Sequence, residues 1–309
     1  MDVHNAFLHG DLTEEVYMKI PPGFEKGRHG QSYSDYSLFT YSKKATRLNV
    51  LVYVDDLIIP GNNRADSVAF KEYLHTCFHM KDLGKLKYFL GIEVAWSREG
   101  IFLCQQKYAL DIISEAGLLG SKPVIFPMEQ NQKLGLSTIH TLSQFLQKQK
   151  EDHWVASLRV VRYLKGSPGQ GVLLQRENTR VLQGWCHSDW AACPTTRRSV
   201  TGWIVFLGSS LVSWKSKKQD TFSLSSAEAE YRAMAKLTCE LKWMQGLLEC
   251  LDVRQQDLMQ VHCVSQLTLH LARNPVFHER SKHIEFDCHF LDDALLDGPI
   301  SASHVCTSS

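Results

Sequence analysis

Two adjacent carboxylates, Asp55 and Asp56, interrupt the apolar stretch LVYVDDLII at residues 51–59. A buried carboxylate is costly unless it is paired or binds a metal. Two Asp side chains on a rigid turn, joined by a third acid from a neighbouring strand, supply the oxygen ligands that Mg²⁺ prefers. A pair of such ions catalyses phosphoryl transfer on nucleic acid. The alternative is ordinary turn chemistry, in which Asp accepts hydrogen bonds from the nearby backbone.

The elements that must position these acids are predicted from composition and periodicity. Residues 48–54 and 57–59 are rich in Val, Ile and Tyr, which predicts a hairpin with the acidic pair as its turn. Apolar residues at three- and four-residue steps from Met234 to Leu251 predict a long helix, and Ser225 to Glu228 fit a capping box at its start. Further strands or helices are expected at 88–96, 101–104, 181–189, 202–207, 211–215, 260–264 and 266–273. This order predicts an α/β fold.

Bulk composition is that of an ordinary globular protein. The 309 residues carry a net charge of +1, so any basic surface that binds nucleic acid must be local. No C-x-x-C pattern, signal peptide or apolar run of about 20 residues is present, and we expect an intracellular chain, cytoplasmic or nuclear, without a membrane partner. The candidate nucleic-acid-binding cations, each of which could equally be a solvated surface charge, are Lys215, Lys217, Lys218, Arg197 and Arg198.

Longer motifs bring out a family resemblance. They are DVHNAFLHG at the start, EEVYMKIPPGF, YVDD, MKDLGKLKYFLGIEV, HWVASLRVVRYLKG, SWKSKKQ, LSSAEAEYRAMA and NPVFHERSKHIEFDCHF. Together they resemble the reverse transcriptase and RNase H region of Ty1/copia-type retrotransposon Pol polyproteins, most closely those of plants. The resemblance implies an incomplete reverse-transcriptase palm at 1–121, a linker and connecting helix at 122–170, and an RNase H-like mixed-sheet domain at 171–309.

For the polymerase half, the resemblance implies that Asp2, Asp55 and Asp56 hold two Mg²⁺ ions, or Mn²⁺ in their place. Tyr53 would support the primer end or simply pack on its strand. The implied partners are a primer-template and an RNA–DNA hybrid.

For the RNase H half, four carboxylates and two Mg²⁺ ions are implied. His187 stands where the first metal-binding Asp is expected, beside Asp189, and Val264 replaces the third acid. Glu228 matches the second acid, while Glu285, with Asp287 in reserve, matches the fourth. Val cannot bind Mg²⁺ and imidazole suits softer metals, so we expect this activity to be absent or severely weakened.

The polymerase half also departs from the family pattern. A segment that includes a motif like Ser-Leu-Tyr-Gly-Leu-Lys-Gln is missing between Phe24 and Asp35, and a second block is missing near residues 136–141. The strands that precede Asp2 in the family and the residues that follow Asp293 are also reduced. Because a polymerase must hold its nucleotide in attack geometry, we expect an internally deleted copy with impaired synthesis.

Three other interpretations remain open. The chain could be a non-catalytic nucleic-acid-binding remnant, or a relic without a role. A zinc site is the third, although its irregular spacing argues against it; its ligands would be His278, His283, Cys288 and His289.

Overall fold

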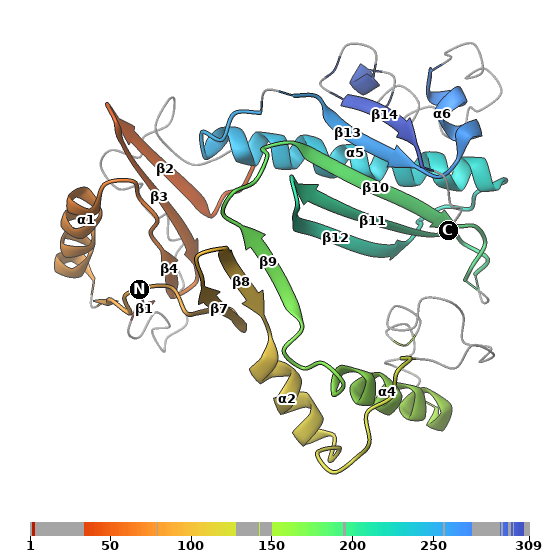
Figure 1. The fold of residues 1–309 in the computed structure, drawn as a ribbon, viewed down its shortest axis with the longest axis horizontal. Helices are drawn as coiled ribbons and strands as arrows, with labels where there is room; N and C mark the ends of the chain where they lie inside the picture. The colour runs from red at the N-terminus through yellow and green to blue at the C-terminus, as the bar shows by residue number, and fades with distance from the viewer. Residues whose placement is uncertain are drawn as a thin grey trace, which may run out of the picture. The chain divides into compact units, whose positions relative to one another are not determined.

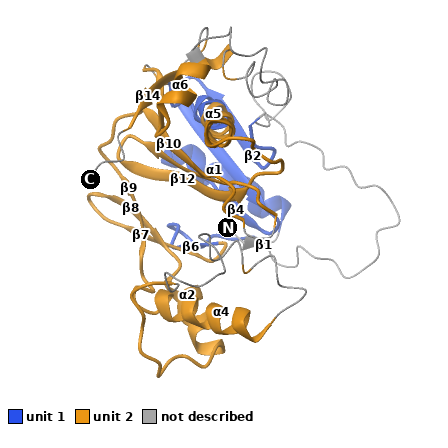
Figure 2. Ribbon diagram, turned by 90° about the vertical axis from the view of Figure 1, so that its right-hand side faces the viewer, with its two compact units in different colours: residues 1–89, 243–254 blue, residues 90–242, 255–309 orange. Residues whose placement is uncertain are grey.

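The computed structural model contains helices and several sheets, which confirms the predicted α/β class. It describes residues 2–3 (as backbone), 34–78, 80–127, 142, 150–193, 196–255, 257–273, 291, 293–295, 298 and 300–305. The chain forms two compact units, residues 1–89 with 243–254 and residues 90–242 with 255–309 (Figure 2). We describe each unit by itself. No helix in the described ranges is long and apolar enough to cross a membrane.

Unit 1 is built on a five-stranded sheet in the order β2-β3-β4-β1-β5. Its strands are β1 (Asp2–Val3), β2 (Leu38–Lys43), β3 (Thr46–Tyr53), β4 (Asp56–Ile58) and β5 (Met80–Lys81). Helix α1 (Arg64–Cys77) begins where the Asn63 side chain accepts a hydrogen bond from the Ala65 amide. Strand β6 (Tyr88–Phe89) follows β5 along the chain. Leu48 and Val50 of β3 and Leu74 of α1 are buried, so strand β3 and the helix contribute to the same core.

Unit 2 begins with an antiparallel hairpin of β7 (Ile92–Trp96) and β8 (Gly100–Cys104), close to the predicted one. Strand β9 (Gly171–Gln175) pairs with the other side of β8, although about 70 residues separate them. Between these strands lie helices α2 (Gln106–Glu115) and α4 (Glu151–Leu164). The Lys165 ammonium joins the two helices, because it donates to the carbonyls of Leu118, Leu119 and Ser121 just beyond α2.

The second sheet of unit 2 has the order β12-β11-β10-β13-β14. Its strands are β10 (Leu182–Asp189), β11 (Val200–Leu207), β12 (Ser210–Lys218), β13 (Met259–Cys263) and β14 (Ile300–His304). The first three form an antiparallel meander, while β13 runs parallel to β10 and β14 runs parallel to β13. The predicted strands at 181–189, 202–207, 211–215 and 260–264 are therefore confirmed within a few residues.

Helix α5 (Ser226–Cys250) lies along one face of this sheet, and α6 (Gln266–Arg273) follows β13 (Figure 1). The predicted apolar stripe is the buried face of α5, where Met234, Leu237 and Leu241 have no exposed surface. The contact is close, because a Cβ added to Gly184 of β10 would lie 2.6 Å from Leu237 Cδ1. The opposite face of the sheet carries no such helix among the described residues.

Candidate functional site

The Asp55–Asp56 pair lies at the tip of the β3–β4 hairpin. Tyr53 pairs with Asp56, so the two residues of the turn are Val54 and Asp55, and Asp56 is the first residue of β4. The prediction that both acids form the turn was therefore wrong by one residue. Val54 has φ +52° and a side chain that is 58% exposed. A β-branched residue in this region is a rare outlier, and such strain is concentrated at functional sites.

The predicted third acid lies next to this hairpin. Strand β1 pairs antiparallel with β4, and Asp2 is the register partner of Asp56. On its other side Asp2 is opposite Lys81 of β5. The backbone thus brings Asp2 within one strand spacing, about 4.8 Å, of Asp56. Asp55 and Asp56 are both half-buried, and carboxylate oxygens are suitable Mg²⁺ ligands. The role of these acids in binding metal stays a prediction, as does the predicted role of Tyr53, a residue that is 52% exposed.

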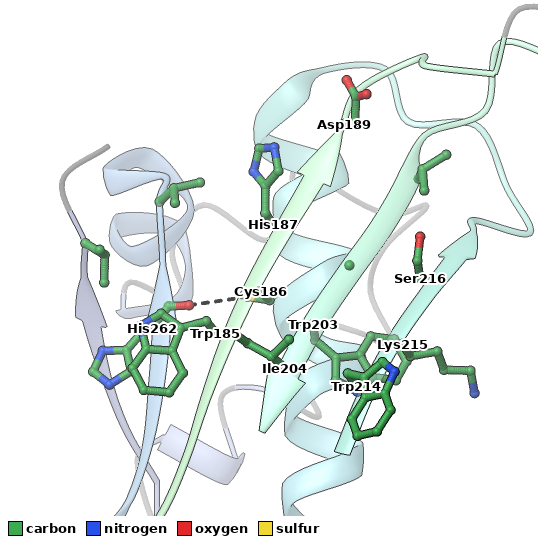
Figure 3. A pocket seen from close by; sticks show the side chains of 14 residues that line it. Trp185, Cys186, His187, Asp189, Trp203, Ile204, Trp214, Lys215, Ser216 and His262 are labelled. Atoms are coloured by element: carbon green, nitrogen blue, oxygen red, sulfur yellow. Dashed lines mark hydrogen bonds between the residues drawn. The ribbon is translucent and has the colours of Figure 1, made fainter. Parts of the chain in front are cut away.

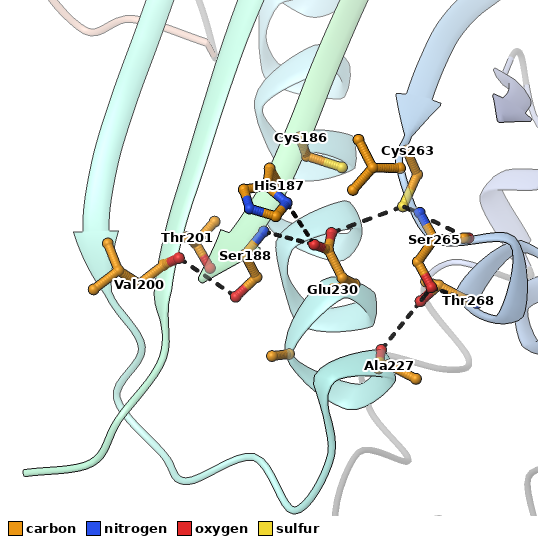
Figure 4. A network of polar contacts seen from close by, with 12 residues as sticks. Cys186, His187, Ser188, Val200, Thr201, Ala227, Glu230, Cys263, Ser265 and Thr268 are labelled. Carbon is orange, nitrogen blue, oxygen red and sulfur yellow. Dashed lines mark hydrogen bonds and ion pairs between the residues drawn. The ribbon is translucent and has the colours of Figure 1, made fainter. Parts of the chain in front are cut away.

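A second polar site lies at the end of β10 in unit 2. His187 Nδ1 is 2.7 Å from Glu230 Oε1 of α5, and the Ser188 amide donates to the same oxygen at 3.0 Å (Figure 4). The His187 side chain is 65% exposed, whereas that of Glu230 is 6% exposed. Burial raises the pKa of Glu230, and its contacts with Ser188 and His187 oppose that rise. His187, which the family resemblance aligns with a metal-binding Asp, is therefore itself the partner of a buried carboxylate.

Glu228, the predicted second acid of the RNase H half, makes its contacts within the start of α5 and with the residues just before it. Its backbone amide donates to the Ser225 hydroxyl oxygen at 3.2 Å, its Oε2 accepts a hydrogen bond from the Leu224 amide at 2.7 Å, and its Oε1 accepts one from the Arg232 guanidinium at 2.8 Å. The predicted cap at Ser225 is confirmed. Two residues along a helix turn the side chain by about 200°, so Glu228 and Glu230 face different directions. The acid that α5 brings to β10 is Glu230, which the sequence reasoning missed, although it belongs to the same SSAEAEY motif.

Of the other positions predicted for RNase H acids, the structure describes residues 189 and 264. Asp189 ends β10, two residues beyond His187, and Val264 directly follows β13; both line the same groove as His187. Within the described residues, no group of three His, Cys, Asp or Glu side chains could hold a metal ion. Because His187 is bonded to Glu230 and Val264 offers no ligand atom, these residues do not fit a pair of Mg²⁺ ions. Glu285, Asp287 and the four zinc candidates lie outside the described residues.

The groove has a volume of 550 Å³ and lies on the sheet face opposite α5 (Figure 3). The register places one row of side chains across four strands, in the order Trp214, Ile204, Trp185 and His262. The Trp185 ring stacks on His262 with their centroids 4.6 Å apart and meets Phe206 edge-on at 5.4 Å. An apolar row of this kind is normally covered or used for binding.

Four of the five predicted nucleic-acid-binding cations gather at one end of the sheet. Lys217 and Lys218 end the edge strand β12, and the register pairs them with Thr201 and Val200 at the start of β11. Arg197 and Arg198 lie in the segment just before β11, separated from it by Ser199, and Arg198 lies 5.6 Å from the centre of the Phe222 ring. Asp189 is also the register partner of Val200. The cations therefore lie at the same end of the sheet as Asp189 and His187.

Lys215 lies apart from these four. It is three residues before the end of β12 and sits 5.4 Å from the centre of the Trp203 ring. It lines the groove rather than the end of the sheet. Its contact is a cation–π interaction, so part of its charge already has a partner within the protein.

Comparisons with known proteins agree with these features. The family described as "Reverse transcriptase (RNA-dependent DNA polymerase)" matches residues 26–130. The Pol polyproteins of the Arabidopsis thaliana transposons RE2 and RE1 are 34% and 33% identical to this chain over 99% of its length. The chain spans about a quarter of those relatives, 26% and 25% of their lengths. The alignment with the first runs over 374 positions against 309 residues here, so the relative has residues without a counterpart.

Among solved structures, RNase H1 from Halobacterium salinarum matches 41% of this chain and 86% of its own, at 14% identity and a TM-score of 0.27. A score of that size carries no argument about the fold. The assignment of the chain therefore depends on its sequence relatives.

Proposed function

Because this chain belongs to the copia-type family of retrotransposon Pol polyproteins, we propose that it is a shortened reverse transcriptase–RNase H segment that binds nucleic acid and is impaired in both activities. The observation that carries the nuclease part of the proposal is the contact between His187 Nδ1 and Glu230 Oε1 at 2.7 Å. Two-metal hydrolysis of RNA in an RNA–DNA hybrid would need carboxylates at this position that are free to bind cations. Here the carboxylate of Glu230 is already in contact with the imidazole of His187.

The polymerase half keeps all three of the acids that the family resemblance implies, whereas the RNase H half does not. Asp2, Asp55 and Asp56 are the residues that would hold Mg²⁺, or Mn²⁺ in its place. The ions would activate the primer 3′-hydroxyl and stabilise the leaving pyrophosphate. The chain's own contribution is the β3–β4 hairpin, which pairs with β1, so that Asp2 and Asp56 lie on neighbouring strands and Asp55 lies in the adjoining turn. The alignment gaps support the view that segments for template and nucleotide are missing, which would lower synthesis.

The test of the polymerase proposal is primer extension by the purified chain in Mg²⁺ and, separately, in Mn²⁺. The matched control is Asp55→Asn, which keeps the size of the turn residue and removes its charge. We expect extension by the unchanged chain to be no greater than that of the variant. Extension clearly above the variant would contradict the claim of an impaired polymerase.

The nuclease proposal is tested on an RNA–DNA hybrid. The double variant His187→Asp with Val264→Asp restores two carboxylates at the positions that the family resemblance identifies. We expect it to cleave the hybrid faster than the unchanged chain, and we expect Glu230→Gln added to it to abolish that gain. Glu228→Gln is the comparison, because Glu228 serves the helix cap. A gain that depends on Glu228 and not on Glu230 would overturn this arrangement.

A second candidate function is binding without catalysis. This function is favoured by the four cations at the open end of the β11–β12 hairpin, where β11 begins and β12 ends. Phosphate contacts of such cations supply most of the affinity for nucleic acid. Such binding would persist in a metal chelator and weaken steeply with salt. Binding that needs a divalent ion, or that salt leaves unchanged, would argue against it.

A further inference from the structure

Two cysteines of the second sheet lie directly opposite each other. Cys186 of β10 is the register partner of Cys263 of β13, and the two strands run parallel. Neighbouring strands are about 4.8 Å apart, within the range of about 4.4–6.8 Å between the Cα atoms of a disulfide. Partners in a parallel pair point to the same face, and here that face is the one under α5. Both residues are buried, with 3% and 0% of their surface exposed.

The two thiols have only weak partners of their own. Cys186 Sγ lies 3.7 Å from the His262 carbonyl oxygen (Figure 3), and Cys263 Sγ lies 3.9 Å from Glu230 Oε2 (Figure 4). The Ser265 amide donates to Cys263 Sγ at 3.4 Å. These contacts hold the Cys263 sulfur between the end of β13 and α5 without a strong hydrogen bond.

We propose that Cys186 and Cys263 form an internal disulfide when the protein meets a peroxide. The Cys263 thiolate attacks one peroxide oxygen, breaks the O–O bond and becomes a sulfenic acid, while the second oxygen leaves as water. The Cys186 sulfur then attacks the sulfenic sulfur and expels its oxygen as a second water. Two thiols and one hydrogen peroxide give one disulfide and two waters, so the electrons lost by sulfur reduce the peroxide.

The environment supports this order of attack. The hydrogen bond from Cys186 lowers the pKa of the Cys263 thiol, and the same pairing, with burial, raises the pKa of Cys186. Cys263 is then the thiol that loses its proton first, and the thiolate is the nucleophile. The bond would tie β10 to β13 just before His187 and Val264 and would remove the thiol contact with Glu230.

The experiment uses the full chain and hydrogen peroxide. After oxidation, free thiols are blocked with N-ethylmaleimide in denaturant, and the protein is digested with trypsin without reductant. We expect a disulfide-linked peptide pair that joins residues 181–197 to residues 255–273 and separates on addition of dithiothreitol. Because the first peptide also contains Cys193, Cys193→Ser is the matched control and should keep the link. Cys186→Ser and Cys263→Ser should each lose it entirely.

Three outcomes would overturn the proposal. One is oxidation of exposed thiols such as Cys77 and Cys239 while residues 186 and 263 stay free. Another is a link that survives Cys186→Ser but not Cys193→Ser. The third is sulfinic or sulfonic acid at residue 263 without any link. The first and third outcomes are measured on the unchanged chain, without any substitution. A variant that fails to fold therefore does not decide the test.

Discussion

His187 Nδ1 lies 2.7 Å from Glu230 Oε1, and this contact joins an exposed imidazole to a carboxylate that is almost fully buried. A buried carboxylate needs a compensating charge or several hydrogen-bond donors. Glu230 receives the Ser188 amide and the His187 ring, and the thiol of Cys263 lies near its other oxygen. The Ser188 amide and the His187 ring therefore occupy the carboxylate oxygen that a cation would otherwise contact. We infer that this end of the sheet is stable without metal.

Removing the imidazole should cost stability. We expect His187→Ala to lower the free energy of unfolding by about 1 kcal/mol, because Glu230 loses a partner while it stays buried; exposure of the imidazole keeps the figure small. Urea unfolding near pH 6 measures the change. His270→Ala, which truncates an exposed histidine on α6, is the control and should have little effect. In a Glu230→Gln background the cost of His187→Ala should shrink, and an undiminished cost would contradict the pairing.

The cations at the end of β12 should act through phosphates. We expect Lys217→Ala to weaken binding to an RNA–DNA hybrid and to reduce the slope of log affinity against log salt by about 1, the value for one lost phosphate contact. Lys107→Ala removes an exposed lysine on α2 and serves as the control. The measurement is fluorescence anisotropy with a labelled hybrid over a salt series. Equal slopes for the two variants would show that the end of β12 is not the binding surface.

Much of this fold follows from local patterns in the sequence. The apolar repeat from Met234 to Leu251 predicts α5 because one stripe of a helix must be buried. The alternation of residues in LQGWCHSD similarly predicts β10, whose burial alternates along its length. The Asp55–Asp56 hairpin is also visible, since two apolar runs flank a turn. Each of these features depends on residues close together in the chain.

The parts that the sequence could not predict depend on how distant elements meet. Whether Glu228 or Glu230 faces β10 is decided by the rotation of α5 about its axis, and the family resemblance alone did not distinguish the two acids of one motif. The pairing of β9 with β8 across a long separation has no local signal. The turn at Val54 was misplaced because a β-branched residue at positive φ is disfavoured by propensity and is set by the surrounding sheet.

Acid should destabilise the sheet through His262. Burial lowers the pKa of this residue below its usual 6.5, where it stacks on Trp185 and bonds to Ser303 at 2.7 Å. The folded chain then binds a proton less readily than the unfolded chain. The neutral ring therefore favours folding above pH 6.5, and this contribution is lost as the pH falls through the lowered pKa.

The measurement is urea unfolding of the unchanged chain and of His262→Gln, each at neutral pH and at about pH 5. Gln keeps a polar group near Ser303 and does not titrate. We expect the unchanged chain to lose more stability on acidification than the variant does. Equal losses would mean that His262 has the same proton affinity in the folded and unfolded states.

The contact of α5 with β10 gives the sharpest packing test. A Cβ atom added to Gly184 would lie 2.6 Å from Leu237 Cδ1, and Leu237 is fully buried. We expect Gly184→Ala to destabilise the chain by about 1–3 kcal/mol, since the helix must move away from the strand. Gly202 of the next strand has its nearest neighbour, the Lys215 carbonyl oxygen, at 3.9 Å. Gly202→Ala should therefore stay within about 0.5 kcal/mol of the unchanged chain. Urea unfolding compares the two variants, and a smaller loss for Gly184→Ala than for Gly202→Ala would show that α5 does not pack on β10 in this register.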